Sequence, residues 1–350
     1  MPHVVLFLFL QRHGVGSFYW ANGDMFFGEW RHDMITGRGR KVFHNGDVYQ
    51  GEFRLNNYHG WGVKCFCGGG RHEGYYKDGK RHGFGRYFWK NGDIYAGMWK
   101  DGRMTGRGRK NLQGGDVFTG EWLEDKACGR GVKTFKRGDT HVGMYMQDTR
   151  NGYGMYTWQN RDRYEGLWED GQMCGRGIKN MHSNSAVYDG EWKKNQADGW
   201  GRKLFGNGDI HEGRYKQDYR MQCGRYQWKN GNIYVGMWHK GKQHGKGVLY
   251  VHENKTIYCG TWKNSMKQDG IHYDNTTDTF VVQTWKNGIR TLHTPMDMDQ
   301  KKDKDTVCRV VLDTVRDIDD THPVAVQAGV SARKTFRLVL AQGNPIFLLL

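Results

Sequence analysis

Proline is almost absent from this chain, which contains 4 prolines and 52 glycines in 350 residues. Aromatic residues make up 14% of the sequence. This combination is typical of many short strands joined by tight glycine turns, and it argues against a bundle of helices. We therefore expect an all-β chain with few helices.

Long apolar segments and paired cysteines are also missing. The most apolar run, residues 4–10, is too short to span a bilayer, and it lacks a basic region before it and a small-residue cleavage site after it. None of the 7 cysteines belongs to a Cys-x-x-Cys pattern, and their number is odd. We expect a reduced, cytoplasmic environment, with the apolar run as part of the fold.

Catalytic motifs are absent as well. The sequence has no Gly-x-x-x-x-Gly-Lys-Ser/Thr phosphate loop and no Gly-x-Ser-x-Gly elbow, and its Asp and Glu residues mostly occupy turns. We predict that the protein is not an enzyme and needs no cofactor or metal ion. Its 53 Lys and Arg residues against 37 Asp and Glu residues give a net charge of +16, which attracts acidic protein tails, anionic lipid headgroups or nucleic acid without choosing among them.

A repeat of 23 residues, twice lengthened to 24, organises most of the chain. Each copy contains an aromatic-x-Gly-x-aromatic phrase, with the glycine at Gly28, Gly51, Gly74, Gly97, Gly120, Gly143, Gly166, Gly190, Gly213, Gly236 and Gly260. Nine residues later most copies have a Gly-x-Gly pair, such as Gly106 and Gly108. Turn sequences such as residues 90–93 and 100–103 separate the two segments, so each copy predicts a β-hairpin.

The alternation within each strand predicts which side chains form the core. In the phrase at residues 95–99, Tyr95, Gly97 and Trp99 share one face, and Ala96 and Met98 share the other. Stacked repeats would align these aromatic rings in a ladder. Glycine is required where a ring covers the backbone, because a Cβ would displace the ring.

This repeat resembles the membrane occupation and recognition nexus (MORN) repeat, whose unit reads roughly Tyr-x-Gly-x-Trp-x-x-Gly-x-x-x-Gly-x-Gly. The resemblance covers about residues 1–288. It implies an elongated, twisted single-sheet solenoid of antiparallel β-hairpins. Two strands per repeat advance roughly 9 to 10 Å, so about eleven repeats predict a rod on the order of 100 Å long.

A second period of three repeats lies within the first. Every third repeat replaces the leading aromatic by His72, His141 or His211, and the closing Trp by Tyr76, Tyr145 or Tyr215. One interpretation is an inherited triplet duplication; the other is a superhelix or a partner lattice with matching spacing. Successive histidines would lie roughly 30 Å apart, too far to share one metal ion.

Two columns of side chains are the candidate partner-binding residues. The first holds the residues between the paired glycines, where cations and aromatics interleave: Arg38, Trp61, Phe84, Arg107, Arg130, Tyr153, Arg176, Trp200 and Lys246. The second is a lysine column represented by Lys41, Lys110 and Lys179. One interpretation is that these residues bind an acidic peptide or a lipid headgroup by charge and stacking. The other is that the aromatic side chains pack against turns and are covered by the aliphatic parts of the arginine side chains. Nucleic acid is the least favoured partner, because no RNP, KH or zinc motif accompanies the column.

The ends of the chain depart from the repeat. We expect a degenerate N-terminal cap at residues 1–13, a closing strand at residues 280–288, and a charged linker at residues 289–305. Residues 306–350 form a C-terminal tail in which Val307, Cys308, Val311, Leu312, Val315 and Ile318 have the spacing of a short amphipathic helix. This helix would dock on the array or on a partner.

Pure arrays of this family often belong to radial spokes, axonemes and other cytoskeletal assemblies. The resemblance therefore implies a structural adaptor that bridges cytoskeletal components, plausible in a cilium or flagellum, with acidic tubulin tails as an electrostatic match. The alternative is a peripheral membrane module that binds anionic phospholipids through its Lys and Arg columns. Some relatives dimerise, so the resemblance also leaves a homodimer open.

Overall fold

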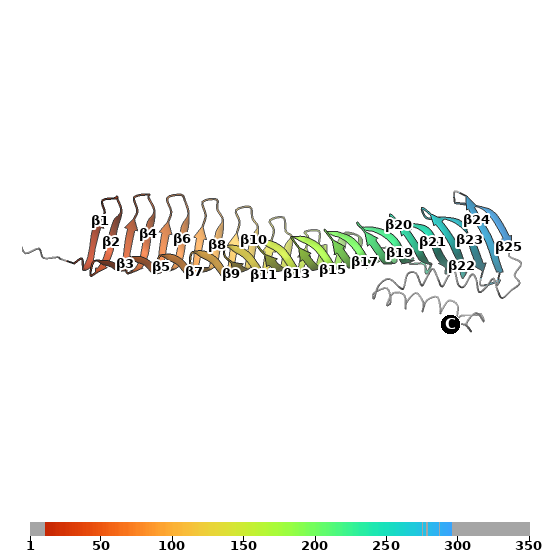
Figure 1. The fold of residues 1–350 in the computed structure, drawn as a ribbon, viewed down its shortest axis with the longest axis horizontal. Coiled ribbons are helices and arrows are strands. Elements are labelled where there is room, and N and C mark those ends of the chain that lie inside the picture. The colour runs from red at the N-terminus through yellow and green to blue at the C-terminus, as the bar shows by residue number, and fades with distance from the viewer. Residues whose placement is uncertain (1–10, 275, 278, 287, 296–350) are drawn as a thin grey trace, which may run out of the picture. The chain divides into compact units, whose positions relative to one another are not determined.

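The computed structural model describes residues 11–274, 276–277, 279–286 and 288–295. The chain divides into two compact units, Met1–Gln159 and Asn160–Leu350, which we describe separately. In both units the described residues form antiparallel β-strands in chain order, joined by turns (Figure 1). The predicted all-β array of hairpins is thus confirmed, while the C-terminal tail and its predicted helix lie outside the described residues.

Thirteen strands form the N-terminal unit, and each pairs with the next. They are β1 (Gly14–Tyr19), β2 (Met25–Arg31), β3 (Met34–Val42), β4 (Val48–Arg54), β5 (Asn57–Cys65), β6 (Arg71–Lys77), β7 (Lys80–Phe88), β8 (Ile94–Lys100), β9 (Arg103–Asn111), β10 (Val117–Leu123), β11 (Lys126–Thr134), β12 (Thr140–Met146) and β13 (Thr149–Thr157).

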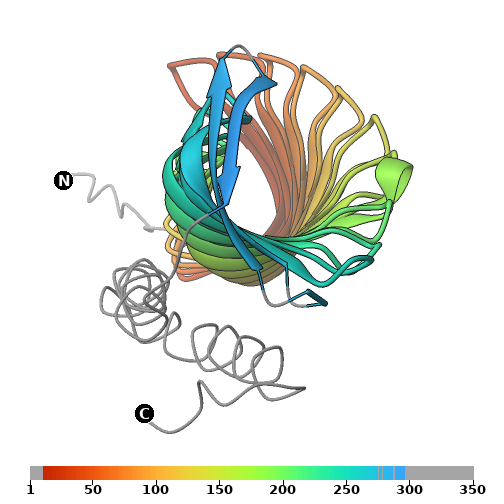
Figure 2. The ribbon, with the colours of Figure 1, turned by 90° about the vertical axis from the view of Figure 1, so that its right-hand side faces the viewer.

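The C-terminal unit continues the same pattern with twelve strands and one short 3₁₀ turn at His182–Asn184. The strands are β14 (Arg163–Glu169), β15 (Gln172–Met181), β16 (Ala186–Lys193), β17 (Gln196–Leu204), β18 (Ile210–Lys216), β19 (Tyr219–Gln227), β20 (Ile233–His239), β21 (Lys242–Val251), β22 (Thr256–Lys263), β23 (Met266–Asp274), β24 (Thr279–Lys286) and β25 (Ile289–Pro295). Figure 2 looks along the rows of strands and shows hairpins bent into arcs.

Two turns alternate along each unit. Between β8 and β9, Asp101 and Gly102 have φ angles of 49° and 87°, the left-handed pair that a two-residue hairpin turn requires. Between β7 and β8 the turn is longer, and the Gly92 N–H donates to the Trp89 carbonyl over 3.0 Å. Asp93 ends this turn, and its carboxylate accepts a hydrogen bond from the Gln113 N–H of the next such turn, over 3.0 Å. Neighbouring hairpins are therefore joined through their turns as well as their strands.

The aromatic ladder forms the core of each unit, as the alternation predicts. Tyr95 and Trp99 are buried, whereas Met98 between them is exposed. The Tyr95 hydroxyl donates to the Met98 carbonyl over 3.0 Å, and the Trp99 indole N–H donates to the Gly85 carbonyl over 3.3 Å. We call the side of the sheet that carries these rings the ladder face, and the opposite side the second face.

The glycines of the repeat make room for this ladder. A Cβ at Gly108 would lie 2.3 Å from the Tyr95 hydroxyl oxygen, and a Cβ at Gly97 would lie 2.4 Å from the same atom. Gly106 has another role, since its φ of 56° belongs to a bulge where the register of β8 and β9 shifts. Gln222 occupies the corresponding bulge position in β19 with a φ of 55°.

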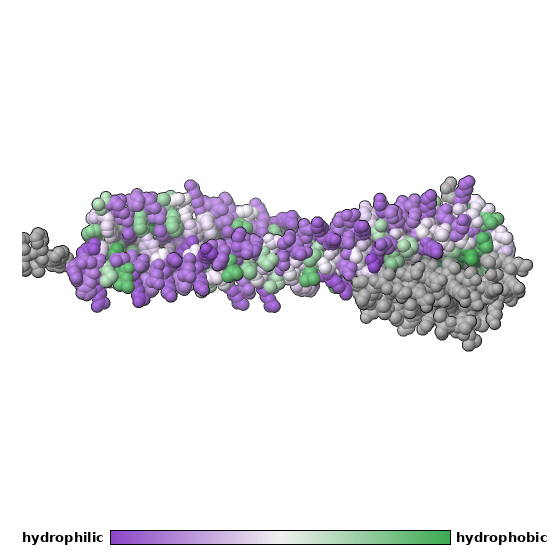
Figure 3. Space-filling view, in the orientation of Figure 1, coloured by the Kyte–Doolittle hydropathy of each residue, from purple (hydrophilic) through white to green (hydrophobic). Residues whose placement is uncertain are grey.

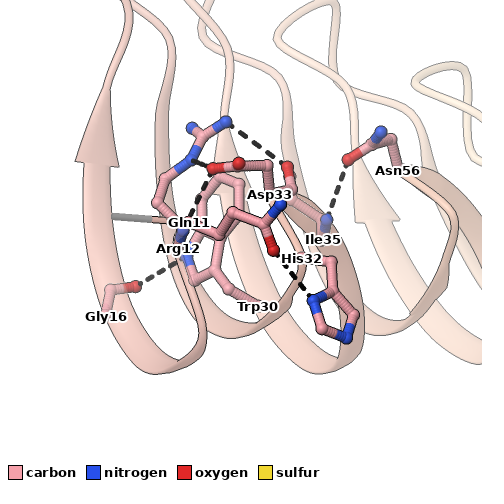
Figure 4. Close-up of polar contacts among 8 residues, drawn as sticks. All are labelled: Gln11, Arg12, Gly16, Trp30, His32, Asp33, Ile35 and Asn56. Carbon is pink, nitrogen blue, oxygen red and sulfur yellow. Dashed lines mark hydrogen bonds and ion pairs between the residues drawn. The ribbon is translucent and has the colours of Figure 1, made fainter. Parts of the chain in front are cut away.

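The described residues also include the first turn of the array. Arg12 donates from its backbone N–H and from Nε to the Asp33 carboxylate, each over 3.0 Å, and Gln11 contacts His32 (Figure 4). The Arg12 guanidinium lies 4.2 Å from the centre of the Trp30 ring. Residues 11–12 thus cover the first turn and ring of the ladder, and residues 1–10 of the predicted cap lie outside the described part.

At the other end, the array extends beyond the predicted closing strand. Residues 279–286 form β24, which overlaps the segment 280–288 that the sequence analysis assigns to a closing strand. β25 follows at residues 289–295 and pairs with β24, in the segment that the sequence assigned to the linker. The segment 289–295 lacks the glycine and aromatic residues of the repeat, and every residue of β25 is exposed, so no pattern of alternate burial marks it.

Candidate interaction surfaces

The two candidate columns lie on opposite faces of the sheet. Lys110 of β9 stands opposite Tyr95 of β8, so the lysine column lies on the ladder face. Arg107 is an odd number of residues from Lys110 and belongs to the second face, together with the other residues between paired glycines. The twelve predicted residues therefore cannot form one continuous site.

The lysine column is engaged within the fold. Lys41 Nζ lies 3.4 Å from an Asp24 oxygen and 4.7 Å from the centre of the Phe43 ring. Lys110 lies 3.8 Å from Asp93 and 4.7 Å from the Trp89 ring centre. Such ion pairs and cation–π contacts attach each lysine to a turn and to the ladder. Lys179 has a similar place, opposite both Tyr164 and Tyr188 in the register.

The aspartates that meet the lysines are electrostatically stabilised. Hydrogen bonds donated by His44, with a contribution from Lys41, lower the pKa of Asp24 to about 2. Burial acts to raise the pKa of Asp47, but the hydrogen bond from the Cys67 N–H and the charge of Lys64 together lower it. These carboxylates remain charged at neutral pH and offset the positive charge of the lysine column.

On the second face of the N-terminal unit, the predicted column is exposed. All six members are on the surface of the sheet: Arg38, Trp61, Phe84, Arg107, Arg130 and Tyr153. In the space-filling view, apolar groups form separate patches on a mainly hydrophilic surface (Figure 3). This half of the column has the exposure that a contact surface requires.

Two further residues complete an apolar surface that the sequence analysis missed. Tyr75 pairs with Trp61 across β5 and β6, and Met98 pairs with Phe84 across β7 and β8. All four side chains are exposed, and we call them the β5–β8 patch. Tyr75 and Met98 each follow the glycine of the aromatic-x-Gly-x-aromatic phrase, which is the position that could have revealed them.

In the C-terminal unit the residues of the same column differ in their exposure. Arg176 is exposed and lies 3.9 Å from Asp189, and Lys246 is exposed. Trp200, however, is 6% exposed, so the expectation that it is an exposed contact residue is not met. It belongs to a second-face cluster with Cys223, Ile233, Val235, Val248, Tyr250, Ile257, Cys259, Ile271, Tyr273 and Phe280.

The histidines of the three-repeat period are packing residues of the ladder. His72 is fully buried and its Nδ1 lies 2.8 Å from the Tyr76 hydroxyl; the pairs His141–Tyr145 and His211–Tyr215 repeat this contact at 2.7 Å. Burial, with a contribution from Arg81, lowers the pKa of His72 to about 3, and the same effect with Arg150 lowers that of His141 to about 4. These imidazoles are therefore neutral at physiological pH.

An arginine accompanies this histidine. The Arg81 guanidinium lies 4.2 Å from the Trp99 ring centre and donates to the Gly102 carbonyl over 2.7 Å. Arg220 makes the same contacts with Trp238 and Gly241. The three-repeat period is thus a coordinated change in histidine, tyrosine, arginine and turn glycine, with a structural basis in the ladder itself.

The described residues contain neither a candidate metal site nor a candidate membrane-spanning helix. No group of three or more His, Cys, Asp and Glu side chains in this part of the chain could hold a metal ion. No helix within it is long and apolar enough to cross a membrane.

Comparison with known proteins identifies the repeat. The profile of the MORN repeat matches eleven segments, at residues 11–25, 26–48, 49–71, 72–94, 95–117, 118–140, 141–163, 164–179, 188–210, 211–233 and 234–250. None of the curated proteins matches the chain.

Two of the solved structures that match the chain differ from it widely in fold. The TCP domain of SAS-4 (dCPAP) in complex with a proline-rich motif of Ana2 (dSTIL) from Drosophila melanogaster is 12% identical, with 52% of this chain and 85% of that chain covered and a TM-score of 0.24. A streptogramin B lyase structure is 13% identical, with 79% and 92% covered and a TM-score of 0.13. Both scores are too low to support an argument. The family assignment therefore comes from the eleven matched segments, which span most of the chain, and the protein belongs to the MORN repeat family.

Proposed function

We propose that this MORN array is a non-catalytic scaffold that binds acidic segments of other proteins through the second face of its N-terminal unit. The family indicates a protein-interaction or membrane-binding module. The observation that carries the proposal is the separation of the two columns: the lysines are engaged on the ladder face, whereas arginines and aromatics are exposed together on the second face.

The chemistry of this face suits an acidic peptide. Arg38 precedes the β5–β8 patch along the sheet, and Arg107 and Arg130 follow it. A guanidinium can bind a carboxylate through two parallel hydrogen bonds, and Trp, Tyr and Arg are the residues that most often dominate protein interfaces. The net charge of +16 would also steer an acidic partner towards the array.

Acidic cytoskeletal surfaces, such as the tails of tubulin, are partners with this chemistry. We place the scaffold in the cytoplasm, on the cytoskeleton, with a ciliary or flagellar axoneme as the favoured assembly. The support is the match of charge and the stacked repeats, which offer successive contacts at regular spacing.

The second candidate is a peripheral membrane module. It is favoured by one observation, the exposure of Trp61 and Phe84 on a face that also carries arginines, because aromatic rings with nearby cations suit the interface of an anionic bilayer. Liposome binding is therefore the matched alternative in the test.

The test compares two assays across a salt series: sedimentation with microtubules and flotation with liposomes that contain an anionic phospholipid. We expect sedimentation with microtubules, and its loss when the acidic tubulin tails are removed by limited proteolysis. Binding to liposomes without binding to microtubules would replace the first proposal by the second.

Charge-reversal variants locate the contact. The variant Arg38→Glu, Arg107→Glu, Arg130→Glu should weaken microtubule binding by at least about tenfold, since it repels the partner at three contact positions. The control Lys90→Glu, Lys136→Glu, Lys229→Glu changes the net charge equally, at exposed residues of the longer turns. Equal weakening by both variants would show a nonspecific charge effect and refute the second face as the contact.

A further inference from the structure

The second face changes its chemistry near the end of the array. On β9 and β17 the residue that follows the second glycine of the pair is charged, Arg109 and Arg202 respectively. Asp189 of β16, the cross-strand partner of Arg202, is charged as well. From β20 to β24 the equivalent residues are all apolar: Val235, Val248, Cys259, Ile271 and Val282. The sheet thus carries an apolar second face over its last strands.

Burial shows that this apolar face is covered. Val132 and Val142, on the second face of β11 and β12, are 41% and 42% exposed. Val235 and Val248 occupy the same positions on β20 and β21 and are 1% and 0% exposed. Strands β14 to β25 pair edge to edge with their neighbours, and none of the described strands is layered over this face. The pairing of the described strands therefore does not account for this burial.

The C-terminal segment is apolar enough and long enough to cover the second face of the last strands. β25 ends at Pro295 beside β24, and the charged residues 296–305 follow. Ten residues span at most about 33–36 Å, whereas the five strand spacings from β25 back to β20 amount to only about 24 Å. Beyond them, residues 307–318 have apolar side chains at helical spacing, and residues 336–340 and 346–350 are apolar runs.

We propose that residues 306–350 fold back and pack their apolar side chains on the second face of β20 to β24. The segment thereby caps the end of the repeat array with a second layer, as a repeat array requires where its last apolar surface has no further repeat to cover it. The second face of the N-terminal unit remains open for partners, so one end of the array is reserved for the chain's own tail. This inference does not depend on which partner the open face binds.

The reactivity of the native cysteines measures whether the apolar second face is covered. Cys223 and Cys259 are buried in the second-face cluster, whereas Cys65 and Cys67 are exposed. Burial also raises the pKa of the Cys259 thiol to about 11, which slows its alkylation further. The measurement is the rate at which iodoacetamide modifies each cysteine in the full-length chain, followed by mass spectrometry of its peptides. We expect Cys259 to react at least about a hundredfold more slowly than Cys65.

Two matched variants test the tail. Val311→Asp with Val315→Asp places charges on the predicted apolar side of residues 307–318 and should speed alkylation of Cys259 at least about tenfold. Arg309→Gln with Arg316→Gln makes the same change in net charge away from that side and should leave the rate unchanged. Unchanged protection of Cys259 in the first variant, in a monomer, would overturn the proposal.

A second measurement uses the unaltered chain and so does not depend on how a variant folds. A short amine-reactive diazirine attached to the lysines at 301, 302 and 304 inserts on illumination into nearby side chains without needing an exposed thiol, and it should link this segment to β20–β24 within one chain. A link between two chains, together with a dimer in sedimentation and protection that falls on dilution, would assign the apolar face to a second copy and overturn the proposal. Rapid alkylation of Cys259 in the wild-type chain would do the same.

Discussion

Substitution of Gly108 by alanine tests the account of the ladder most directly. The added Cβ would lie 2.3 Å from the hydroxyl oxygen of Tyr95 and 2.5 Å from its Cε2 atom. Tyr95 is fully buried and donates to the Met98 carbonyl over 3.0 Å, so its ring has no free space to enter. The ring must move by roughly 1 Å to restore an ordinary contact, and the hydrogen bond is then lost.

The expected cost follows from these two effects. Overpacking a tight core costs about 1–3 kcal/mol, and a buried hydroxyl without a partner costs about 1–3 kcal/mol more. Together they give a destabilisation of about 4 kcal/mol. Gly16 offers a matched control, because it occupies the same repeat position in β1 but has no described atom within 4 Å of its added Cβ. Since alanine is favoured over glycine in a strand interior, Gly16→Ala should be neutral or stabilising by up to about 1 kcal/mol.

The assay is urea unfolding followed by circular dichroism, with hydrogen exchange of the β8 and β9 amides, because repeat arrays open locally as well as globally. A double-mutant cycle adds Tyr95→Ala. That substitution alone costs about 3–5 kcal/mol, but in its background Gly108→Ala should cost almost nothing. Equal effects of Gly108→Ala and Gly16→Ala, or additivity in the cycle, would refute the idea that the glycines make room for the rings.

Three further predictions concern pH, the bulge and the turns. Histidine in an unfolded chain has a pKa near 6.5, whereas burial lowers the pKa of the ladder histidines. The unfolded chain therefore binds more protons as the pH falls. The free energy of unfolding should decrease by about 2 kcal/mol per histidine between pH 7 and 5. Replacement of the three histidines by Phe should make the urea midpoint less dependent on pH; the residues are His72, His141 and His211. An unchanged pH dependence would contradict the conclusion that these histidines are buried and neutral. Gln222→Gly should raise stability by about 0.5–1 kcal/mol, because glycine adopts φ 55° without strain, and a lower urea midpoint would count against a strained bulge. Asp125→Ala should cost at least about 1 kcal/mol, because it removes the acceptor of the Met104 N–H and places alanine at a φ of 69°, while Asp125→Asn should retain stability, a difference that thermal unfolding would detect.

The sequence predicts the hairpins and the ladder well, because each position recurs many times along the chain. The strand that carries Tyr95 and Trp99, the turn at Asp101 and the buried glycines all agree with the structure. Position in the repeat determines face and burial when every neighbour is another copy of the same repeat. The family assignment has the same basis.

Contacts that depend on the neighbouring repeat are harder to predict. Lys110 and Asp93 are seventeen residues apart, and only the stacked turns bring them together beside Trp89. The alternation places Lys110 correctly on the tyrosine side, but charge alone suggested a free contact residue. In the same way, the burial of Trp200 depends on apolar residues several strands further along, which its own repeat does not contain.

The two faces are under different physical constraints, and this explains where function can vary. On the ladder face each ring fits against glycines of its own and the next strand, so a change at one repeat disturbs its neighbours. On the second face of the N-terminal unit the side chains meet solvent, and substitutions there cost little. The composition of the second face accordingly changes along the chain, from aromatics on β5–β8 through charged residues to aliphatic residues on β20–β24. Because the ladder holds every repeat in the same register, each of these surfaces can change independently while the fold stays constant, and partner specificity should therefore reside in the second face.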